Sequence, residues 1–339
     1  MTGTAYPQTD RRTDAVRLHR LMTGFLASKS LFSALELGVF DALEEGACTP
    51  EELGARVGLE ARPARVLLLA LEGEALVSRG GGRYANNPIA STFLVRGSAG
   101  YMGPLAVHQD THFGKFARLT EALRDNKPVR AGENYSGAFG GDQQWARRWA
   151  EITRASSLLM AEDLAAIAPV EGRRHLVDLG CASCAYSMAF ARANPGLRIT
   201  AVDMPAVSEV AAEFVSAAGL ADRVAVRPAN IFEDRFEDCD VALLSHVIQG
   251  FDRERSRQLI RHIHDWLPEG GEVLVHTHLP ERATVPFPYL FGLILLINNT
   301  QGGEAHGEEL TRRWLEGAGF HVVEVAEVSP ISALIRATK

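Results

Sequence analysis

The residues best suited to bind a ligand stand where two apolar runs each end in an acid. Residues 176–180 read Leu-Val-Asp-Leu-Gly, and a helical pattern begins at once near Ala185. A second apolar run, residues 197–202, ends in Asp203. This order predicts a strand, a tight turn, a helix and a second strand, as in the nucleotide-binding half of a doubly wound sheet. In that arrangement backbone N–H groups face the ligand, and the acid accepts hydrogen bonds from a ribose diol.

The turn itself is poor in glycine. Gly180 is present, but Cys181, Ala182 and Cys184 stand where the backbone of such loops usually needs room. Because alanine and cysteine are small, we expect weakened or displaced binding rather than complete exclusion. The two cysteines could also form a redox pair, since a helix N-terminus lowers the pKa of a thiol. Small residues filling the place of missing glycines are the favoured interpretation, because a redox pair would occupy the ligand loop.

Composition limits the class of protein. The chain has 339 residues, of which 46% are hydrophobic and 23% charged, and its formal net charge is −7. A negative balance argues against a nucleic-acid partner, because phosphate binding needs an excess of Lys and Arg. We find neither a run of about 18 apolar residues nor a basic-then-apolar start. The 4 scattered cysteines form no secreted framework. These features predict a cytoplasmic protein that spans no membrane.

The first part of the chain, residues 1–98, has a winged-helix pattern. Residues 16–38 carry helical apolar spacing, and Thr49 followed by Pro50 is a strong helix start. The helix that starts there should end at Gly58, with a second one over 62–76 and a two-stranded wing over 77–84. Residues 64–71 are too apolar for a helix that reads a DNA groove. A buried or dimer-forming helix is the better interpretation, and we expect a homodimer.

The rest of the chain should form a helical linker, residues 99–168, and an α/β domain, residues 169–339. Strand and helix patterns alternate from His175 onward, and the two last apolar runs could pair antiparallel at a sheet edge. The expected strands are 175–179, 198–202, 223–228, 240–245, 271–278, 320–328 and 331–338. The expected helices are 185–194, 206–218, 253–267 and 308–317.

This order of elements resembles the class I S-adenosylmethionine-dependent methyltransferases. More narrowly, it is similar to the bacterial small-molecule O-methyltransferases related to the plant phenolic enzymes and to hydroxyneurosporene methyltransferase. The resemblance covers almost the whole chain. It implies an all-α winged-helix dimerisation domain followed by a Rossmann-like, seven-stranded methyltransferase domain. The motifs that carry it are Val177–Gly180, Ala185–Ser187, Asn194–Pro195, Val202–Pro205, Leu244–Val247, Leu267–Gly271 and Asn299–Gly303.

The resemblance also implies ligands and site residues. The cofactor would be S-adenosylmethionine, bound weakly or only structurally if the loop has lost its function, and the partner a small-molecule acceptor. The implied cofactor-binding residues are Asp178, Gly180, Ala182, Asp203, Met204, Asn230, Ile231 and Ser245. Asn230 replaces the acid usual at the adenine. The candidates for the acceptor pocket, for each of which helical core packing is nearly as good an interpretation, are His108, His112, Trp149 and Met160.

The family's catalytic base is missing. Family members carry a histidine just past the fourth strand, where it removes the acceptor's proton. Gln249 occupies that place here, and a neutral amide cannot act as a base at pH 7, although it can orient a substrate. His246 or His306 is the best substitute. The sequence His264-Asp265-Trp266 looks like the missing motif but falls in the following helix. We interpret it as a coincidence, with Trp266 packed inward and His264 exposed.

Four histidines could gather near the strand ends: His246, His276, His278 and His306. Some keto-acid C-methyltransferases of the family use a metal. The spacing of these histidines lacks the specificity of a metal site, so buried or hydrogen-bonded histidines are the better interpretation and no metal is predicted.

Three functions remain open. The leading hypothesis is methyl transfer to a small acceptor in bacterial secondary metabolism, by proximity and orientation of the bound reactants. Without a base at Gln249, N- or C-methylation is favoured over O-methylation of a phenol. The second hypothesis is a methyltransferase fold that catalyses a non-methylating cyclisation or pericyclic reaction. The third is a catalytically inactive dimer partner.

Overall fold

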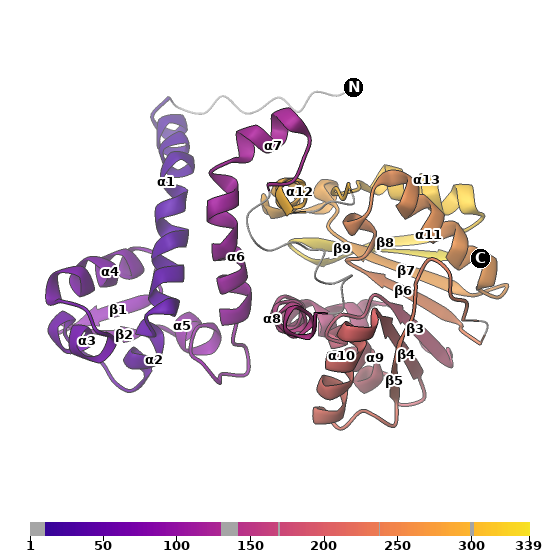
Figure 1. The fold of residues 1–339 in the computed structure, drawn as a ribbon, viewed down its shortest axis with the longest axis horizontal. Coiled ribbons are helices and arrows are strands. Elements are labelled where there is room, and N and C mark those ends of the chain that lie inside the picture. The colour runs from indigo at the N-terminus through magenta and orange to yellow at the C-terminus, as the bar shows by residue number, and fades with distance from the viewer. Residues whose placement is uncertain (1–10, 130–141, 169, 237, 299–301) are drawn as a thin grey trace. The chain divides into compact units, whose positions relative to one another are not determined.

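The structure is a computed structural model that describes residues 11–129, 142–168, 170–236, 238–298 and 302–339. The chain divides into two compact units, residues 1–110 and residues 111–339. Figure 1 shows a helical N-terminal unit and a C-terminal unit built on a sheet. None of the described helices is long and apolar enough to cross a bilayer.

The N-terminal unit has the predicted winged-helix order. Thr49 accepts a hydrogen bond from the backbone N–H of Glu52, whose carboxylate in turn accepts from the N–H of Thr49. This capping box fixes the start of α3, and Gly58 ends the helix in a left-handed conformation. The elements are α1 (Arg11–Glu36), α2 (Val39–Glu44), α3 (Pro50–Val57), α4 (Ala61–Gly73), the antiparallel wing β1 (Val77–Gly80) and β2 (Arg83–Asn86), and α5 (Pro88–Phe93).

Helix α1 keeps an apolar stripe in contact with solvent. Six of its side chains are more than half exposed: Val16, Leu18, Leu21, Met22, Phe25 and Leu26. In α4, by contrast, Leu68 and Leu71 are buried, while Val66 and Leu69 are exposed. Exposed apolar rows of this size are typical of interfaces with another protein. The stripe is therefore a surface suited to a partner.

The linker region is helical, as predicted. Helix α6 (Gly103–Phe116) crosses the division between the two units, and α7 (Leu119–Asp125) and α8 (Gln143–Ile167) belong to the C-terminal unit.

The C-terminal unit is a seven-stranded sheet with the order β5-β4-β3-β6-β7-β9-β8. The first five strands in this order are parallel, and β9 is antiparallel to both of its neighbours. The two last runs pair antiparallel at one edge of the sheet, as expected, with β8 as the edge strand and β9 between β8 and β7. The strands are β3 (His175–Leu179), β4 (Arg198–Asp203), β5 (Val224–Pro228), β6 (Val241–Ser245), β7 (Glu272–Thr277), β8 (His321–Ser329) and β9 (Ser332–Thr338).

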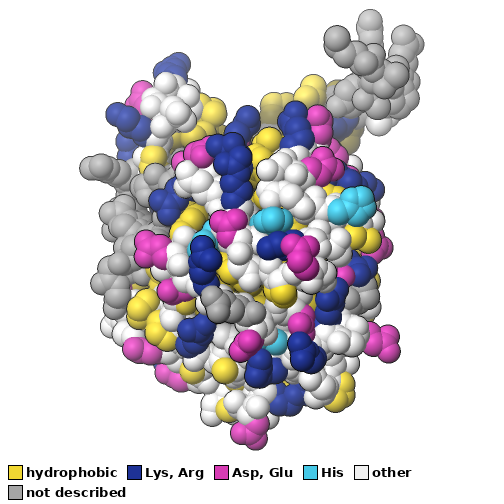
Figure 2. Space-filling view, turned by 90° about the vertical axis from the view of Figure 1, so that its right-hand side faces the viewer, with side chains coloured by type: hydrophobic (Ala, Val, Ile, Leu, Met, Phe, Trp, Pro, Cys, Tyr) yellow, Lys and Arg dark blue, Asp and Glu magenta, His cyan; other side chains and the backbone are white. Residues whose placement is uncertain are grey.

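Helices cover both faces of this sheet, because neighbouring strand residues point to opposite sides. Leu176 joins a core with α8, α9 and α10, whereas Val177 joins a core with α11 and α13. The remaining elements are α9 (Ala185–Ala193), α10 (Pro205–Ala217), the 3-10 turns η2 (Ile248–Gly250) and η3 (Pro280–Arg282), α11 (Arg253–Trp266), α12 (Phe287–Asn298) and α13 (Glu308–Ala318). On the face drawn in Figure 2, basic and acidic side chains are interspersed.

Candidate active site

The predicted ligand loop leaves β3 at Gly180 and enters α9 at Ala185. The N–H groups of Gly180 and Cys181 both donate to the carbonyl of Val202, at 2.8 and 3.0 Å, so the loop folds back over β4. A Cβ added to Gly180 would lie 2.9 Å from a methyl group of Val247. Residue 180 must therefore be glycine to let the segment that follows β6 lie against the loop.

Two residues of the loop adopt glycine-like backbone conformations without being glycine. Ala182 has φ of 47° and Cys184 has φ of 57°, both in the left-handed region. That region costs a residue with a Cβ roughly 1–2 kcal/mol. The two strained residues are among those that replace the missing glycines, so the loop keeps a glycine-like shape at the expense of strain.

Replacing Ala182 with glycine is expected to stabilise the free protein by roughly 0.5–1 kcal/mol. The relieved left-handed strain exceeds the entropy that glycine adds to the unfolded chain. Ala189→Gly, in the middle of α9, is the matched control and should destabilise by about 1 kcal/mol or more. Urea unfolding of both variants measures the difference. Equal destabilisation by the two changes would rule out strain at residue 182.

Asp203 closes the loop from the end of β4. One carboxylate oxygen accepts from the N–H of Ala182 and the other from the N–H of Met204, both at 2.8 Å. Burial raises the pKa of Asp203. A carboxylate held by two backbone N–H groups keeps further lone pairs, and these can accept hydrogen bonds from a ligand.

A second buried acid lies beside it. Asp178 is 1% exposed, and its carboxylate accepts a hydrogen bond of 2.5 Å from the hydroxyl of Ser187. Burial, opposed by that hydrogen bond and reinforced by the charge of Asp203, raises the pKa of Asp178 to about 7. The loop thus has two carboxylates in low-dielectric surroundings, which favours a ligand that brings positive charge.

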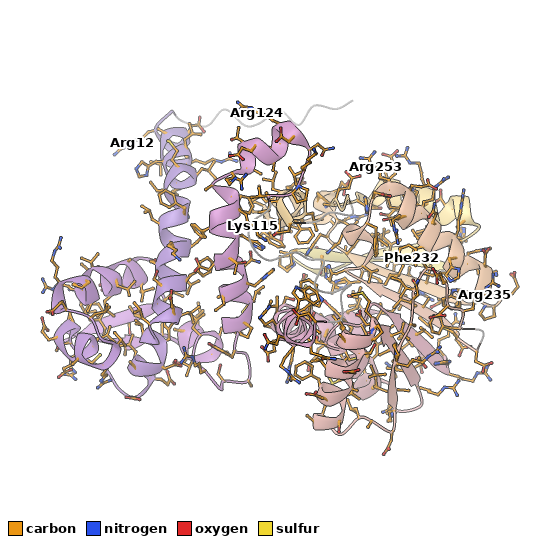
Figure 3. The ribbon with its side chains drawn as sticks, viewed as in Figure 1. Arg12, Lys115, Arg124, Phe232, Arg235 and Arg253 are labelled. Carbon is orange, nitrogen blue, oxygen red and sulfur yellow. The ribbon has the colours of Figure 1, made fainter. Side chains whose placement is uncertain are left out.

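The predicted adenine side follows β5. The side-chain oxygen of Asn230 accepts from the N–H of Phe232 at 3.1 Å, so the amide NH2 of Asn230 remains as a donor. Phe232, which is labelled in Figure 3, lies edge-on to Phe251. The guanidinium of Arg255 lies 4.5 Å from the centre of the Phe232 ring. Ile231 packs against the core below.

Three of the four predicted histidines form one cluster at the carboxyl ends of β6 and β7. The ring of His246 lies 4.5 Å from that of His276 and 4.5 Å from that of His278, measured between centroids. His246 has φ of 56°, and its Nε2 is buried without a hydrogen-bond partner among the described residues. A strained residue with an unsatisfied polar atom is a common sign of a functional site. Tyr186 of α9 lies 6.4 Å from the His246 ring, so the cluster adjoins the ligand loop.

Gln249 is buried in η2, and its amide is fixed. Its side-chain oxygen accepts from the hydroxyl of Thr277 at 2.7 Å, which turns the NH2 group toward Nδ1 of His246 at 3.4 Å. Thr277, which holds this amide, is a residue of the candidate site that the sequence analysis missed. It stands between His276 and His278 at a strand end, which is the signal that could have identified it.

His306 is not part of the cluster. Its Nε2 lies 3.2 Å from the carbonyl of Ile248 and 3.1 Å from the carbonyl of Phe251, at the two ends of η2. Because both partners only accept, this nitrogen carries the proton. We propose that His306 is a positioning residue that holds the turn in which Gln249 lies.

The other predicted residues are dispersed. Ser245 and Met204 flank the site, the former through a 2.9 Å contact of its hydroxyl with Nδ1 of His276. Met160 is buried in the core behind that histidine, with the hydroxyl of Ser332 at 3.5 Å from its sulfur. His112 contacts Phe116, Trp149 stacks on Trp145, and His108 belongs to the N-terminal unit. Asn299, Thr300 and Gln301 lie outside the described residues.

The His264-Asp265-Trp266 motif lies in α11, away from the site. Trp266 is buried against Phe236, as expected. The expectation that His264 is exposed was wrong, because its ring is half-buried with Phe320 edge-on at 4.9 Å. Among the described residues, no group of three or more His, Cys, Asp or Glu could hold a metal ion.

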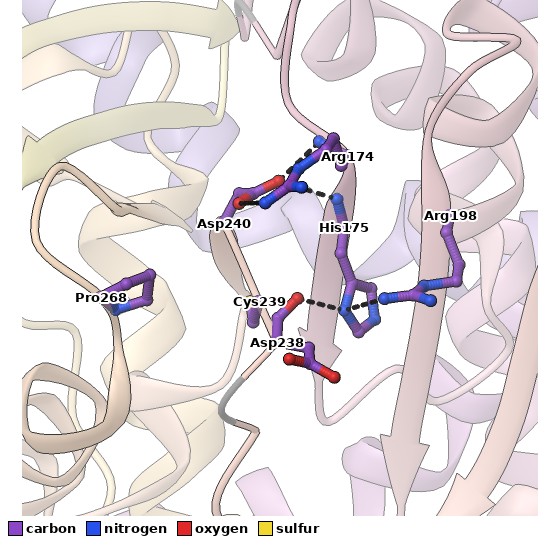
Figure 4. A pocket seen from close by; sticks show the side chains of 7 residues that line it. All are labelled: Arg174, His175, Arg198, Asp238, Cys239, Asp240 and Pro268. Carbon is purple, nitrogen blue, oxygen red and sulfur yellow. Dashed lines mark hydrogen bonds and ion pairs between the residues drawn. The ribbon is translucent and has the colours of Figure 1, made fainter.

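A cavity of about 420 Å³ lies at the amino ends of β3 and β4, whereas the ligand loop follows their carboxyl ends (Figure 4). The carboxylate of Asp240 accepts from the backbone N–H groups of Arg174 and His175 and lies 3.7 Å from the guanidinium of Arg174. The carbonyl of Asp238 accepts from the His175 ring at 2.7 Å. This cavity therefore shares no residue with the ligand loop or the histidine cluster.

The fold and the ligand loop define an S-adenosylmethionine-dependent methyltransferase. The O-methyltransferase domain family matches residues 116–321, and the O-methyltransferase dimerisation domain matches residues 19–96. The chain belongs to this O-methyltransferase family. The match to the dimerisation domain, together with the apolar stripe of α1, supports the predicted homodimer.

Named relatives agree with this assignment. The chain is 31% identical to 3-hydroxy-5-methyl-1-naphthoate 3-O-methyltransferase of Streptomyces sahachiroi, over 88% of this chain and 87% of the relative. It is 29% identical to the N,N-dimethyltransferase OxyT of Streptomyces rimosus, over 92% of each. The crystal structure of human N-acetylserotonin methyltransferase in complex with SAM has the same fold, with a TM-score of 0.85 at 22% identity, over 98% of this chain and 99% of that one.

S-adenosylmethionine is the cofactor, and the residues of the loop fit it. Gly180 leaves no room for a side chain, and the carboxylate of Asp203 keeps lone pairs for a ribose diol. The buried charges of Asp178 and Asp203 suit a cationic ligand. The strained residues Ala182 and Cys184 therefore preserve the loop's shape despite the lost glycines.

Proposed function

We propose that this protein methylates a small aromatic acceptor in bacterial secondary metabolism, at oxygen or nitrogen, by holding acceptor and cofactor in a reactive orientation. The relatives support the class of acceptor, since one is a naphthoate O-methyltransferase and another an N,N-dimethyltransferase. We place the enzyme in the cytoplasm, in keeping with its free cysteines.

The observation that carries this proposal is the fixed amide of Gln249. Thr277 holds the amide oxygen, so the amide can only donate toward the site, and it cannot take a proton. Gln249 therefore orients His246 and, through it, the acceptor. When bound, S-adenosylmethionine supplies an electrophilic methyl group. Gln249 and its partners contribute by orienting the acceptor beside the cofactor, and orientation of bound reactants can lower a barrier by several kcal/mol.

The test combines calorimetry with S-adenosylhomocysteine and turnover of two acceptor probes, a hydroxynaphthoate and an aminonaphthol. Gln249→Ala should lower turnover by less than about tenfold, because orientation and not proton transfer is lost. Gln249→His should raise O-methylation of the hydroxynaphthoate. The control is Gln258→Ala on the exposed face of α11, which should change neither.

Two outcomes would contradict the proposal. If the wild type binds S-adenosylhomocysteine but methylates neither probe, a non-methylating reaction becomes the better hypothesis. If Gln249→Ala lowers turnover a hundredfold or more, Gln249 has the weight of an acid–base group and its assigned role is wrong.

A further inference from the structure

The hydrogen bonds around His246, His278 and His306 show which ring nitrogen carries the proton. A neutral imidazole has one N–H and one lone pair, so a partner that only accepts identifies the N–H. Burial lowers the pKa of His246, His276, His278 and His306, which keeps all four neutral at pH 7. Three of the four rings can therefore be assigned from their partners, whereas both partners of His276 are hydroxyls, which donate or accept.

The rings of His276 and His306 have no nitrogen that could bind the small molecule to be methylated. Both nitrogens of His276 lie 2.9 Å from serine hydroxyls, Nδ1 from Ser245 and Nε2 from Ser332. His306 donates from Nε2 to backbone carbonyls. Its remaining nitrogen belongs to a side chain with no exposed surface, next to Trp314 and outside the cluster.

His246 is assigned by the amide beside it. Thr277 fixes the oxygen of Gln249, so the group that faces Nδ1 of His246 is the NH2. Nδ1 then accepts, and the proton of His246 is on Nε2. That Nε2–H is one of the buried polar groups that have no hydrogen-bond partner among the described residues, so it is a donor that can serve a bound oxygen atom.

His278 has the complementary arrangement. Its Nδ1 lies 2.7 Å from the backbone carbonyl of Ile331, which can only accept, so Nδ1 carries the proton and Nε2 carries the lone pair. His278 is the first residue after β7, so its ring lies at the carboxyl ends of the parallel strands. The rings of Phe287 and Phe291, from α12, lie 5.3 and 4.7 Å from it and give it an apolar wall.

We propose that Nε2 of His278 is the general base for a hydroxyl of the acceptor, while Nε2–H of His246 donates to a neighbouring oxygen of the same molecule. This proposal rests on the proposed methyl transfer and names its substrate class, an aromatic hydroxyl adjacent to a carbonyl or carboxylate oxygen. As the acceptor oxygen forms its bond to the methyl carbon, the carbon–sulfur bond breaks, and sulfur keeps that electron pair. The hydroxyl proton passes to His278, which then releases it to water.

The first test needs no turnover. Long-range ¹H–¹⁵N spectra of the imidazoles are recorded on the full-length protein with S-adenosylhomocysteine at pH 7, with signals assigned through the backbone and checked in His278→Gln and His246→Gln. We expect His278 to be neutral with its proton on Nδ1, and His246 to be neutral with its proton on Nε2. A proton on Nε2 of His278, or a charged ring, would overturn the proposal.

The second test uses two hydroxynaphthoates, one ordinary and one whose hydroxyl is acidified by a nitro group and already ionised at pH 8. His278→Gln should slow methylation of the ordinary acceptor by about 10²–10⁴-fold, because the lost base must be replaced by solvent. The ionised acceptor needs no base and should lose less than about tenfold. His321→Gln, at an exposed position of β8, is the control.

The outcomes separate the possible causes. An equal loss with both acceptors would mean that His278 is structural, and no loss with either would mean that it is not the base. If the wild type methylates neither acceptor while the spectra give the expected protonation, the proposed function fails but the assignment of the two histidines stands.

Discussion

Replacing Asp203 with alanine is expected to weaken binding of S-adenosylhomocysteine by 10²–10⁴-fold. The carboxylate is proposed to accept two ribose hydrogen bonds, and bonds to a charged group contribute roughly 1.5–3 kcal/mol each. The same change leaves the N–H groups of Ala182 and Met204 without their acceptor, so the strained loop also loses its support. Isothermal calorimetry measures the affinity directly.

Asp240→Ala is a closely matched control. Asp240 likewise accepts from two backbone N–H groups, those of Arg174 and His175, but it lies at the amino ends of the strands and not at their carboxyl ends. Its loss should lower stability and leave the affinity for the cofactor unchanged. If the two variants bind equally well, Asp203 is a structural carboxylate and the cofactor does not bind at this loop.

The affinity for S-adenosylmethionine should fall about tenfold for each pH unit below pH 7. Asp178 has a pKa of about 7 in the free protein, and only its ionised form attracts a cation. Below pH 7 binding must therefore release a proton, at a cost of about 1.4 kcal/mol per pH unit. Above pH 7 the affinity for S-adenosylmethionine should no longer change with pH. Calorimetry in buffers of different ionisation enthalpy counts the released proton.

Asp178→Asn should remove this pH dependence and weaken binding at pH 8. It should also stabilise the free protein above pH 7. Folding raises the pKa of this carboxyl group from 3.8 to about 7, so stability is lost as the pH rises from about 4, where the unfolded chain ionises. The loss is complete above pH 7, where it amounts to roughly 4 kcal/mol at most. The exposed Asp222→Asn is the control. A pH dependence that persists in Asp178→Asn would assign the titration to another group.

The sequence predicted the elements of the sheet well, because their signals are local. Apolar runs marked every parallel strand to within about two residues, and the Thr49 capping box marked α3. It gave no signal for α12. Residues 287–298 have no charged side chain and so show no polar face from which a helical period could be recognised. The position of β9 between β7 and β8 was also missed, because strand order depends on contacts between distant segments.

The candidate site was only partly predictable, for a similar reason. Asp203 and Gly180 follow from the strand–turn–helix pattern, and the strained residues Ala182 and Cys184 are at positions flagged by missing glycines. Thr277 acquires its role only through a side-chain bond to a residue 28 positions away. His278 likewise depends on the carbonyl of Ile331, 53 positions away. No local spacing encodes which nitrogen of an imidazole carries a proton.

The hairpin between β8 and β9 makes the chemistry of the site depend on strand register. Ser332, the first residue of β9, supplies the hydroxyl that contacts His276, and Ile331 in the turn supplies the carbonyl that accepts from His278. A slip of β9 by one residue would turn its side chains to the other face and move both partners away. The irregularities in β8, between Val322 and Glu324 and between Glu327 and Ser329, oppose such a slip. A molecule paired in the wrong register would remain compact and would still carry the cofactor loop, yet its imidazoles would no longer be held in the tautomers described above.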